Sequence, residues 1–454
     1  MKLPMLIFVS ILVALTNLKG QWLGYTPSIK DTLSIEIINS EFNNSIIAVG
    51  HKTYVNDIQF GYPKSDSIFI IETPDSGVTW NSNIIYFGKK AYVTTMSRPS
   101  KDIWYIGGVI KNYTNGKLIK TMDHGLTWTE ITPPVSPISS YINEVHFYDE
   151  NNGVVTGDPE DDEFKIYHTE NGGNSWTVLP NNQIPNAISG EFSTSGQTLG
   201  DYVWFTTSNG RIYKSADRGH NWEVYQSILG NLEGVSFSDT LNGIALYGFI
   251  NLDFNTSPII ITADGGKTWK KLDITPLGPK TGIFGASYIP NSSYIMLTTA
   301  KNSLLTGDFA TWISPDRGET WQQISSGENI YTINFQDAST GWGGEGQQLA
   351  HPTRMFQYTG SPLVGLFSDK TLVVDWDVFP NPTADRVQVR VQEDKPTSYL
   401  LLVNDLQGKL ILRKDWDGIG VLDLDLGASC PSGMYTVTLA SKDGKAVRKL
   451  VVAR

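Results

Sequence analysis

Cysteine is almost absent from this chain: Cys430 is the only one among 454 residues. A single cysteine cannot form an internal disulfide, and it cannot supply the ligand set of a zinc or iron–sulfur site. The fold must therefore be stabilised by burial and strand pairing. We expect no cysteine-based metal centre.

Long apolar runs are also scarce. One run, 6–15, follows Met1-Lys2-Leu3, and its length and single positive charge are typical of a secretory signal peptide. We predict that residues 1–20 form this peptide, with cleavage near Gly20-Gln21. The run is shorter than the roughly 20 residues of a membrane span, and no cysteine follows it to carry a lipid. No later segment is apolar enough to cross a bilayer, so we predict no transmembrane segment.

Positive charge is in short supply as well. The chain has 35 Lys and Arg against 46 Asp and Glu, a net charge of −11. Residues 374–454 are balanced, so the excess acid lies in the first 373 residues. An acidic body argues against nucleic acid and anionic membranes as partners, while neutral glycans or divalent cations remain compatible.

What the chain does contain is a repeated motif, Ser/Thr-x-Asp-x-Gly-x-x-Trp, in six copies whose tryptophans lie 46 to 52 residues apart. Asn171 replaces the acid in the third copy. The repeated positions are Asp75, Gly77, Trp80, Asp123, Gly125, Trp128, Asn171, Gly173, Trp176, Asp217, Gly219, Trp222, Asp264, Gly266, Trp269, Asp316, Gly318 and Trp321. A period of about 40–50 residues is typical of a propeller or a repeat array.

The residues of the motif predict a hairpin. In 258–269 a β-branched run enters, a polar turn follows, and Thr268-Trp269 begins the next strand. The Asp side chain accepts hydrogen bonds from the turn, the Gly supplies positive φ, and the Trp can wedge between neighbouring sheets. We therefore expect structural roles for these residues.

Each copy is preceded by two more strand patterns, as in 144–147 and 153–158, so one repeat contains four strands. The half-repeat at 330–358 lacks an outer strand, which 21–25 could supply. We predict an all-β chain: a seven-bladed propeller of four-stranded blades over residues 21–360. A six-bladed ring is the alternative.

The motif resembles the Asp-box of the bacterial neuraminidase repeat (BNR) families, over residues 73–321. That resemblance implies a structural staple far from any active site. The strand pattern of 153–159 and 165–169 also resembles the photosystem II stability and assembly factor family, which implies an assembly or binding role and carries no catalytic mechanism.

A linker is expected at 361–373, followed by short strands separated by glycine turns, which predict a small antiparallel sandwich over 374–454. This tail resembles the C-terminal sorting domain of the Bacteroidetes type IX secretion system. The matching residues are Pro380, Asn381, Pro382, Gly433, Tyr435 and Lys449. The resemblance implies the type IX secretion machinery as a partner, and a secreted protein that is either extracellular or anchored to the outer-membrane surface.

Strand parity locates the candidate site. The Asp-box turns join third to fourth strands and share one face of the ring, so variable loops converge on the opposite face. Carboxylates there are candidates for catalysis: Asp158, Glu160 and Glu345. Candidate ligand-binding residues are His51, Tyr54, Tyr62, Tyr247, Trp342 and Arg354. The acidic stretch from Asp158 to Glu163 is either a solvated loop or a Ca²⁺ site; no other cofactor or metal is expected.

Three functions remain open. The first is a monomeric binding or scaffold module, without catalysis, for a glycan or a protein, and the second is a surface adhesin of the cell envelope. The third, the alternative enzyme, is a glycoside hydrolase that uses two carboxylates. A sialidase is disfavoured, because its carboxylate clamp needs three arginines and the propeller has five, two of which, Arg218 and Arg317, lie inside Asp-boxes.

Overall fold

The computed structural model describes the chain from Trp22 onward, except for a set of short segments. These segments are 28–32, 43–44, 53–65, 111–114, 132–140, 248–257, 279–280, 302–307, 347–352, 361–362, 364–372, 393–398, 406–409, 417, 419, 428–429 and 442–443. The expected signal peptide therefore lies outside the described residues. In the described part, no helix combines the length and hydropathy of a membrane span.

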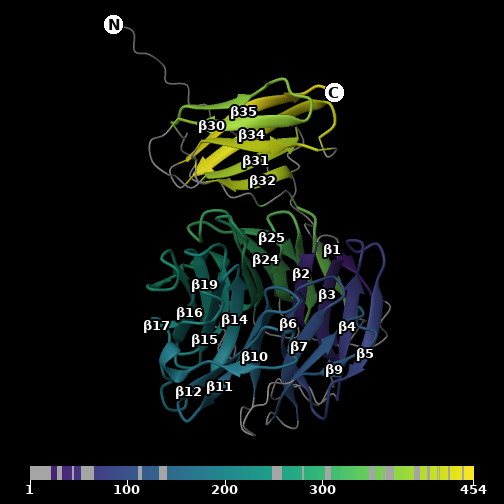
Figure 1. The fold of residues 1–454 in the computed structure, drawn as a ribbon, viewed down its shortest axis with the longest axis vertical. Coiled ribbons are helices and arrows are strands. Elements are labelled where there is room, and N and C mark those ends of the chain that lie inside the picture. The colour runs from purple at the N-terminus through teal and green to yellow at the C-terminus, as the bar shows by residue number, and fades with distance from the viewer. Residues whose placement is uncertain are drawn as a thin grey trace.

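Between Trp22 and Tyr358 the described residues form seven four-stranded antiparallel sheets (Figure 1). Each sheet is one blade. The blades are numbered in chain order, and blade one is the sheet whose inner strand begins at Leu33. Blades one to three contain β2(Leu33–Phe42), β3(Ser45–Lys52), β4(Ser67–Thr73), β5(Asn81–Tyr86), then β6(Tyr92–Ser97), β7(Trp104–Ile110), β8(Asn115–Thr121), β9(Thr129–Glu130), then β10(Ile142–Phe147), β11(Gly153–Glu160), β12(Glu163–Thr169) and β13(Thr177–Val178).

The remaining blades follow the same order from the inner strand outward. Blades four to six contain β14(Ser193–Leu199), β15(Tyr202–Thr207), β16(Arg211–Ser215), β17(Glu223–Gln226), then β18(Leu232–Phe237), β19(Gly243–Tyr247), β20(Ile259–Thr262), β21(Lys270–Lys271), then β22(Thr281–Tyr288), β23(Ile295–Lys301), β24(Asp308–Ser314) and β25(Gln322–Ser326). Blade seven contains β26(Ile330–Phe335), β27(Gly341–Glu345), β28(Met355–Tyr358) and, outermost, β1(Trp22–Tyr25).

The ring closes through blade seven. β1 pairs antiparallel with β28, with Trp22 opposite Tyr358 and Tyr25 opposite Met355. Each inner strand contacts the inner strand of the next blade, and β26 contacts β2, which completes the circle. The predicted contribution of the N-terminal strand is thereby confirmed, and the arrangement favours seven blades over six.

The core lies between the blades. Among the described residues, seven clusters of buried apolar side chains each combine residues of two neighbouring sheets, and one such cluster lies at every junction of the ring. The six motif tryptophans belong to these clusters or pack against them, each joining its own blade to the preceding one. Each motif tryptophan thus packs between neighbouring sheets.

All seven inner strands share an irregularity. The register with the second strand shifts near the loop end of each inner strand, which marks a β-bulge there, and β2 has a second shift near its other end. In blades two to four the extra residue bonds to the next inner strand. Thr94 Oγ1 donates to the carbonyl of Ile142, Asn143 Nδ2 donates to Ser193 Oγ, and Thr194 Oγ1 donates to the carbonyl of Leu232. These bonds link successive blades around the central channel.

The C-terminal part is a separate β-sandwich (Figure 1). Its two sheets contain β29(Trp376–Phe379), β30(Arg386–Val391) and β33(Val421–Asp425), and β31(Tyr399–Asp405), β32(Leu410–Trp416), β34(Gly433–Ser441) and β35(Gly444–Val452). Both sheets supply side chains to one buried core, which includes Cys430. Most of the expected linker lies outside the described residues, but Leu363 packs into the core between blades six and seven.

Candidate functional site

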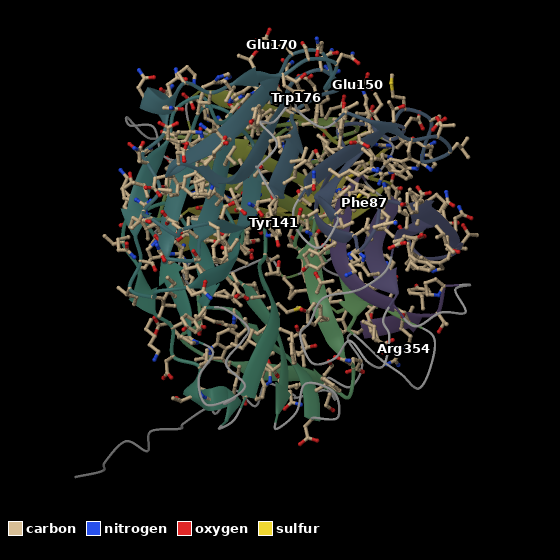
Figure 2. All side chains as sticks on the ribbon, turned by 90° about the horizontal axis from the view of Figure 1, so that it is seen from below. Phe87, Tyr141, Glu150, Glu170, Trp176 and Arg354 are labelled. Atoms are coloured by element: carbon tan, nitrogen blue, oxygen red, sulfur yellow. The ribbon has the colours of Figure 1, made fainter. Side chains whose placement is uncertain are left out.

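The two ends of the ring differ in what they carry. All six Asp-box turns join third to fourth strands and define the Asp-box face; the loops between second and third strands and between blades define the opposite, loop face. Figure 2 shows Glu150, Glu170 and Trp176 toward one end of the ring and Arg354 toward the other, in agreement with strand parity.

On the Asp-box face the motif residues bond to one another. In the second copy, Asp123 accepts bonds from the Thr127 N–H and hydroxyl at 2.8 and 2.6 Å, and Thr121 Oγ1 accepts the N–H of Gly125 at 2.9 Å. Bonding to Thr127 lowers the pKa of Asp123 to about 2. The Asp123 carboxylate therefore stays charged, and its oxygens stay hydrogen-bonded within the turn, which is typical of a structural role rather than of a reacting group.

Two loop-face candidates turn out to be interior. His51 is fully buried, its Nε2 accepts the N–H of Val93 at 3.0 Å, and burial lowers its pKa to about 4. Trp342 is 1% exposed and packs between Trp80 and Tyr25. Neither ring faces solvent, so the expectation that these two side chains contact a ligand is corrected: both belong to the core.

Glu345 and Arg354 form a closed pair. Glu345 is fully buried, and its carboxylate accepts bonds from the Arg354 backbone N–H at 2.8 Å and from the guanidinium at 2.6 and 3.0 Å. Both groups are satisfied by each other, and Arg354 also lies over the ring of Phe356. This arrangement ties β27 to β28, and it corrects the expectation that Glu345 is available for catalysis.

Arg211 is held in the same way, by buried Glu191 and the carbonyl of Asn186. Arg98, Arg218 and Arg317 belong to the Asp-box end of their blades. The five propeller arginines therefore do not converge on one point, which agrees with the sequence argument against a sialidase clamp.

Asp158 is the remaining carboxylate with an unusual environment. It lies on β11 at the junction of blades three and four, where Asn143 Nδ2 donates to it at 2.7 Å and the Ser193 N–H at 3.3 Å. Burial raises the pKa of Asp158 to about 6 despite these bonds. This carboxyl can therefore change charge near neutral pH.

The acidic stretch beyond Asp158 is a tight hairpin. Glu160 pairs with Glu163, and the two residues between them, Asp161 and Asp162, have φ values of 52° and 62°. Two consecutive positive φ values define a type I′ turn, which matches the twist of a hairpin. Among the described residues no group of three or more His, Cys, Asp or Glu side chains could hold a metal ion. The Ca²⁺ interpretation of this stretch remains a prediction.

The tyrosine candidates remain predictions. Tyr54 and Tyr62 lie outside the described residues. Tyr247 ends β19, opposite Leu232, and its side chain is partly exposed.

The sequence reasoning missed three exposed apolar side chains in the loops that lead into and out of blade four. Ile188, Phe192 and Ile228 are 49%, 51% and 58% exposed. Ser193, which bonds to Asp158, directly follows Phe192, and Phe192 exchanges hydrogen bonds with Ser208. We call Ile188, Phe192 and Ile228, together with Asp158, the blade-four surface. The signal available in the sequence was the presence of apolar residues in the loops that connect blades, where polar residues are expected.

These three side chains share one support. Ser208 belongs to the hairpin between β15 and β16. The carbonyl of Gly210, on the same hairpin, accepts the N–H of Ser227, which is the residue directly before Ile228. The Ile188 N–H donates to Glu191, whose carboxylate holds Arg211 on that hairpin. The blade-four surface is therefore carried by segments that are all bonded to one hairpin.

In the C-terminal sandwich, the sequence motif residues connect its beginning to its end. Asn381 Nδ2 donates to the carbonyl of Lys449 at 2.6 Å, and Asn381 Oδ1 accepts the Val451 N–H at 2.9 Å. Tyr435 donates from its hydroxyl to the carbonyl of Pro431 at 2.8 Å. The segment containing Pro380 and Pro382 is thereby fastened against the edge of β35.

Two family models match parts of the chain. Residues 377–453 match the family model described as secretion system C-terminal sorting domain, and residues 113–247 match the model of the photosynthesis system II assembly factor YCF48. No curated relative matches the chain in sequence.

Three solved structures are similar to this chain, and the two with TM-scores above 0.5 share its fold. YCF48 bound to D1 peptide is 16% identical, with a TM-score of 0.53 over 75% of this chain and 98% of that one. YCF48 from Cyanidioschyzon merolae is 15% identical, with a TM-score of 0.52 over 74% and 98%. The GH74 enzyme of Niastella koreensis is 12% identical, with a TM-score of 0.38 over 93% and 84%. At these identities the likeness shows the fold alone. The chain is an all-β propeller protein that carries a C-terminal sorting domain, which indicates export by the type IX secretion system.

Proposed function

We propose that the exported propeller is a binding module that holds a protein segment on the blade-four surface. The observation that carries this proposal is the exposure of Ile188, Phe192 and Ile228 around one hairpin on the loop face. Exposed apolar side chains grouped beside a polar group are typical of a protein interaction site.

The chemistry of the surface suggests what its partner presents. Apolar side chains would cover Phe192 and Ile228, and a donor such as a hydroxyl or an ammonium group would pair with Asp158. The loops are tied to the ring, because Ser193 accepts a hydrogen bond from Asn143 of β10 and Ser208 bonds to Phe192, which directly precedes β14. A preformed surface loses little entropy on binding. A solved relative by fold, YCF48, is described as bound to a peptide, which agrees with this class of ligand.

The test uses the full chain against immobilised peptides of varied sequence and against a glycan array. We expect peptides with apolar residues to bind. The substitution Phe192→Ser should weaken that binding about tenfold or more, because a central aromatic contact commonly contributes over 1 kcal/mol. The matched control is Leu126→Ser, since Leu126 is 81% exposed but lies in an Asp-box turn on the other face. Binding of glycans alone, or equal losses in both variants, would contradict the proposal.

A second candidate function, glycoside hydrolysis, rests on Asp158. A carboxyl with a pKa of about 6 is protonated often enough near neutral pH to act as a general acid. Glu345 does not supply the second carboxylate, because it is buried against Arg354. Incubation of the full chain with a polysaccharide panel, followed by mass spectrometry, tests this candidate. Product that disappears in Asp158→Asn would favour the hydrolase over the binding module.

A further inference from the structure

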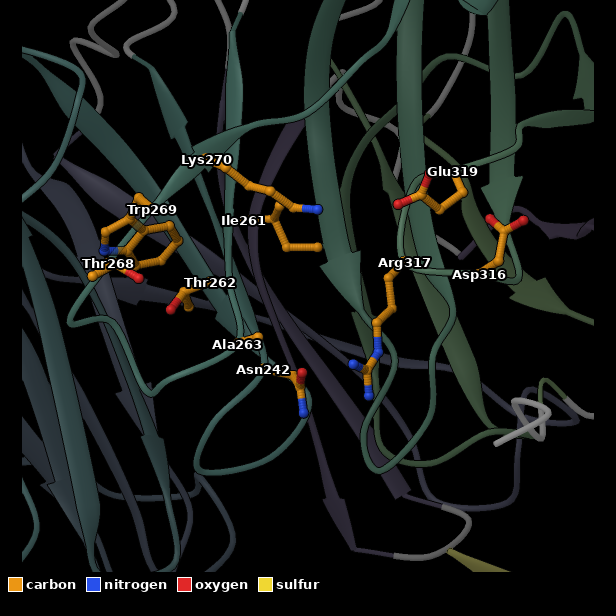
Figure 3. Close-up of a pocket in the computed structure, with 10 residues that line it drawn as sticks. All are labelled: Asn242, Ile261, Thr262, Ala263, Thr268, Trp269, Lys270, Asp316, Arg317 and Glu319. Carbon is orange, nitrogen blue, oxygen red and sulfur yellow. The ribbon is translucent and has the colours of Figure 1, made fainter. Parts of the chain in front are cut away.

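The Asp-box face has a cavity of about 410 Å³ between blades five and six. In Figure 3, Lys270, Ile261 and Trp269 border it on the blade-five side, and Arg317, Asp316 and Glu319 border it on the blade-six side. We propose that this cavity binds a small organic oxyanion, a sugar-sized molecule with a carboxylate or a sulfate, through Arg317 and Lys270. This inference goes beyond the proposed function, because the cavity lies on the opposite face of the ring.

The junction of blades three and four provides an internal comparison. Arg218 occupies the same motif position as Arg317, with φ values of 62° and 60°. The Arg218 N–H donates to the carbonyl of Asp201, and the Arg317 N–H donates to the carbonyl of Ser293. The two backbones are therefore equivalent, and their side chains can be compared directly.

The guanidinium of Arg218 has two partners. Its Nε donates to Asp201 Oδ1 at 2.6 Å, and the group lies 4.9 Å from the ring centre of Tyr148. At the junction of blades five and six, Ser293 takes the place of Asp201, and Ser238 takes the place of Tyr148. The positions of Tyr148 and Ser238 correspond because each residue donates its N–H to the carbonyl of an Asn four residues later. Within the described residues, the Arg317 guanidinium has no hydrogen bond or ion pair.

The space beside the arginine also differs. At the junction of blades three and four, His168 and His220 stack with ring centres 4.3 Å apart. Their sequence counterparts at the junction of blades five and six are Ile261 and Glu319, which line the cavity instead. The counterpart of Thr177 is Lys270, which adds a second cation to the cavity wall. The same framework therefore carries a stacked histidine pair at one junction and a cavity with two cations in its wall at the other.

These features suit an oxyanion on a small body. A guanidinium binds carboxylate and sulfate through two parallel N–H groups, and an ammonium adds charge without directional demand. A volume of about 410 Å³ lies within the range of small-molecule sites. Thr320 and Ser314 hold the Asp316 carboxylate, and among the described residues it forms no ion pair with Arg317 or Lys270. Glu319 is exposed and is the acid that opposes an incoming anion.

Calorimetric titration of the full chain with glucuronate, glucose 6-sulfate and neutral glucose tests the proposal. We expect both charged sugars to bind more tightly than glucose, and added salt to weaken them. Arg317→Gln should weaken charged-sugar binding about tenfold, a loss typical of one charged hydrogen-bonding partner, while Arg218→Gln should leave it unchanged.

Glu319→Gln should strengthen binding, which a merely structural role of the turn would not predict. A preference for one of the two charged sugars would identify the oxyanion. The proposal fails if neither charged sugar binds better than glucose, or if Arg218→Gln and Arg317→Gln have equal effects. It also fails if Glu319→Gln leaves binding unchanged. Phe192→Ser serves as a control for the other face, since it should alter peptide binding without altering the binding of charged sugars.

Discussion

Trp22 packs edge-on against Tyr358, with ring centres 5.6 Å apart, and so joins the first described strand to the last strand of the propeller chain. Trp22 is 6% exposed and also contacts Phe335 of the inner strand. The aromatic contact thus crosses blade seven from its outer strand to its inner one.

We predict that Trp22→Ala lowers the free energy of unfolding by about 3–5 kcal/mol, the usual cost of truncating a buried tryptophan. Leu23→Ala on the same strand should cost much less, because Leu23 is 49% exposed. Urea unfolding of both variants provides the measurement. Equal losses would mean that β1 contributes through its backbone bonds alone.

Asp158 should make stability depend on pH. Its folded pKa of about 6 lies above the ordinary value of 3.8, so the unfolded chain releases this proton first as the pH rises. The free energy of unfolding should therefore fall between pH 4 and pH 6, by about 3 kcal/mol at most, at 1.36 kcal/mol per pKa unit. Asp158→Asn should remove this contribution, so the advantage of the variant over the parent should grow as the pH rises. A constant difference across the range would contradict the buried environment.

His51 should act in the opposite direction. Burial lowers its folded pKa to about 4 from 6.5, so the unfolded chain takes up a proton first as the pH falls. Stability from this residue is lost between pH 6.5 and pH 4, again by about 3 kcal/mol at most. His51→Gln keeps an acceptor for the Val93 N–H, and its free energy of unfolding should depend less on pH between pH 4 and pH 6.5. His146 and His168, whose pKa values burial also lowers to about 4, should preserve part of that pH dependence.

Gly125 should tolerate no side chain. Its φ is +80°, and a Cβ atom there would lie 2.9 Å from the ring of Trp104. We expect Gly125→Ala to cost about 2–4 kcal/mol from backbone strain and steric overlap together. Gly200→Ala is the control, because Gly200 has φ +59° and open space around the Cβ position. The difference between their unfolding midpoints measures the overlap alone; if they matched, strain would account for the whole effect.

The sequence allowed the ring to be predicted because each blade repeats one turn motif. Every copy of the motif has the order Asp, Gly and Trp seen in Asp123, Gly125 and Trp128, except the third, where Asn171 replaces the acid. The role of 21–25 could be predicted too, since the last repeat lacked one strand. The pairing of Trp22 with Tyr358 confirms that inference.

The candidate site was harder to predict because side-chain direction depends on register. Successive side chains of a strand point to opposite faces, and both faces of a blade are covered by the neighbouring blades. His51 and Trp342 were expected to face a ligand, yet both point into the contacts between sheets. Phe192 was missed for a different reason: apolar residues in loops have no periodicity that marks them as exposed.

The closure of blade seven also determines when the propeller can finish folding. The strand that contains Trp22 pairs with Tyr358, which lies 336 residues further along the chain. The other six propeller sheets each form from one contiguous segment. Loop-closure entropy makes such a distant pairing slow, so the first strand should be the last to dock. Until then, β28 has an unpaired edge that can recruit foreign strands. The chain is thus most prone to aggregation in the interval between completing its sixth blade and sealing its seventh.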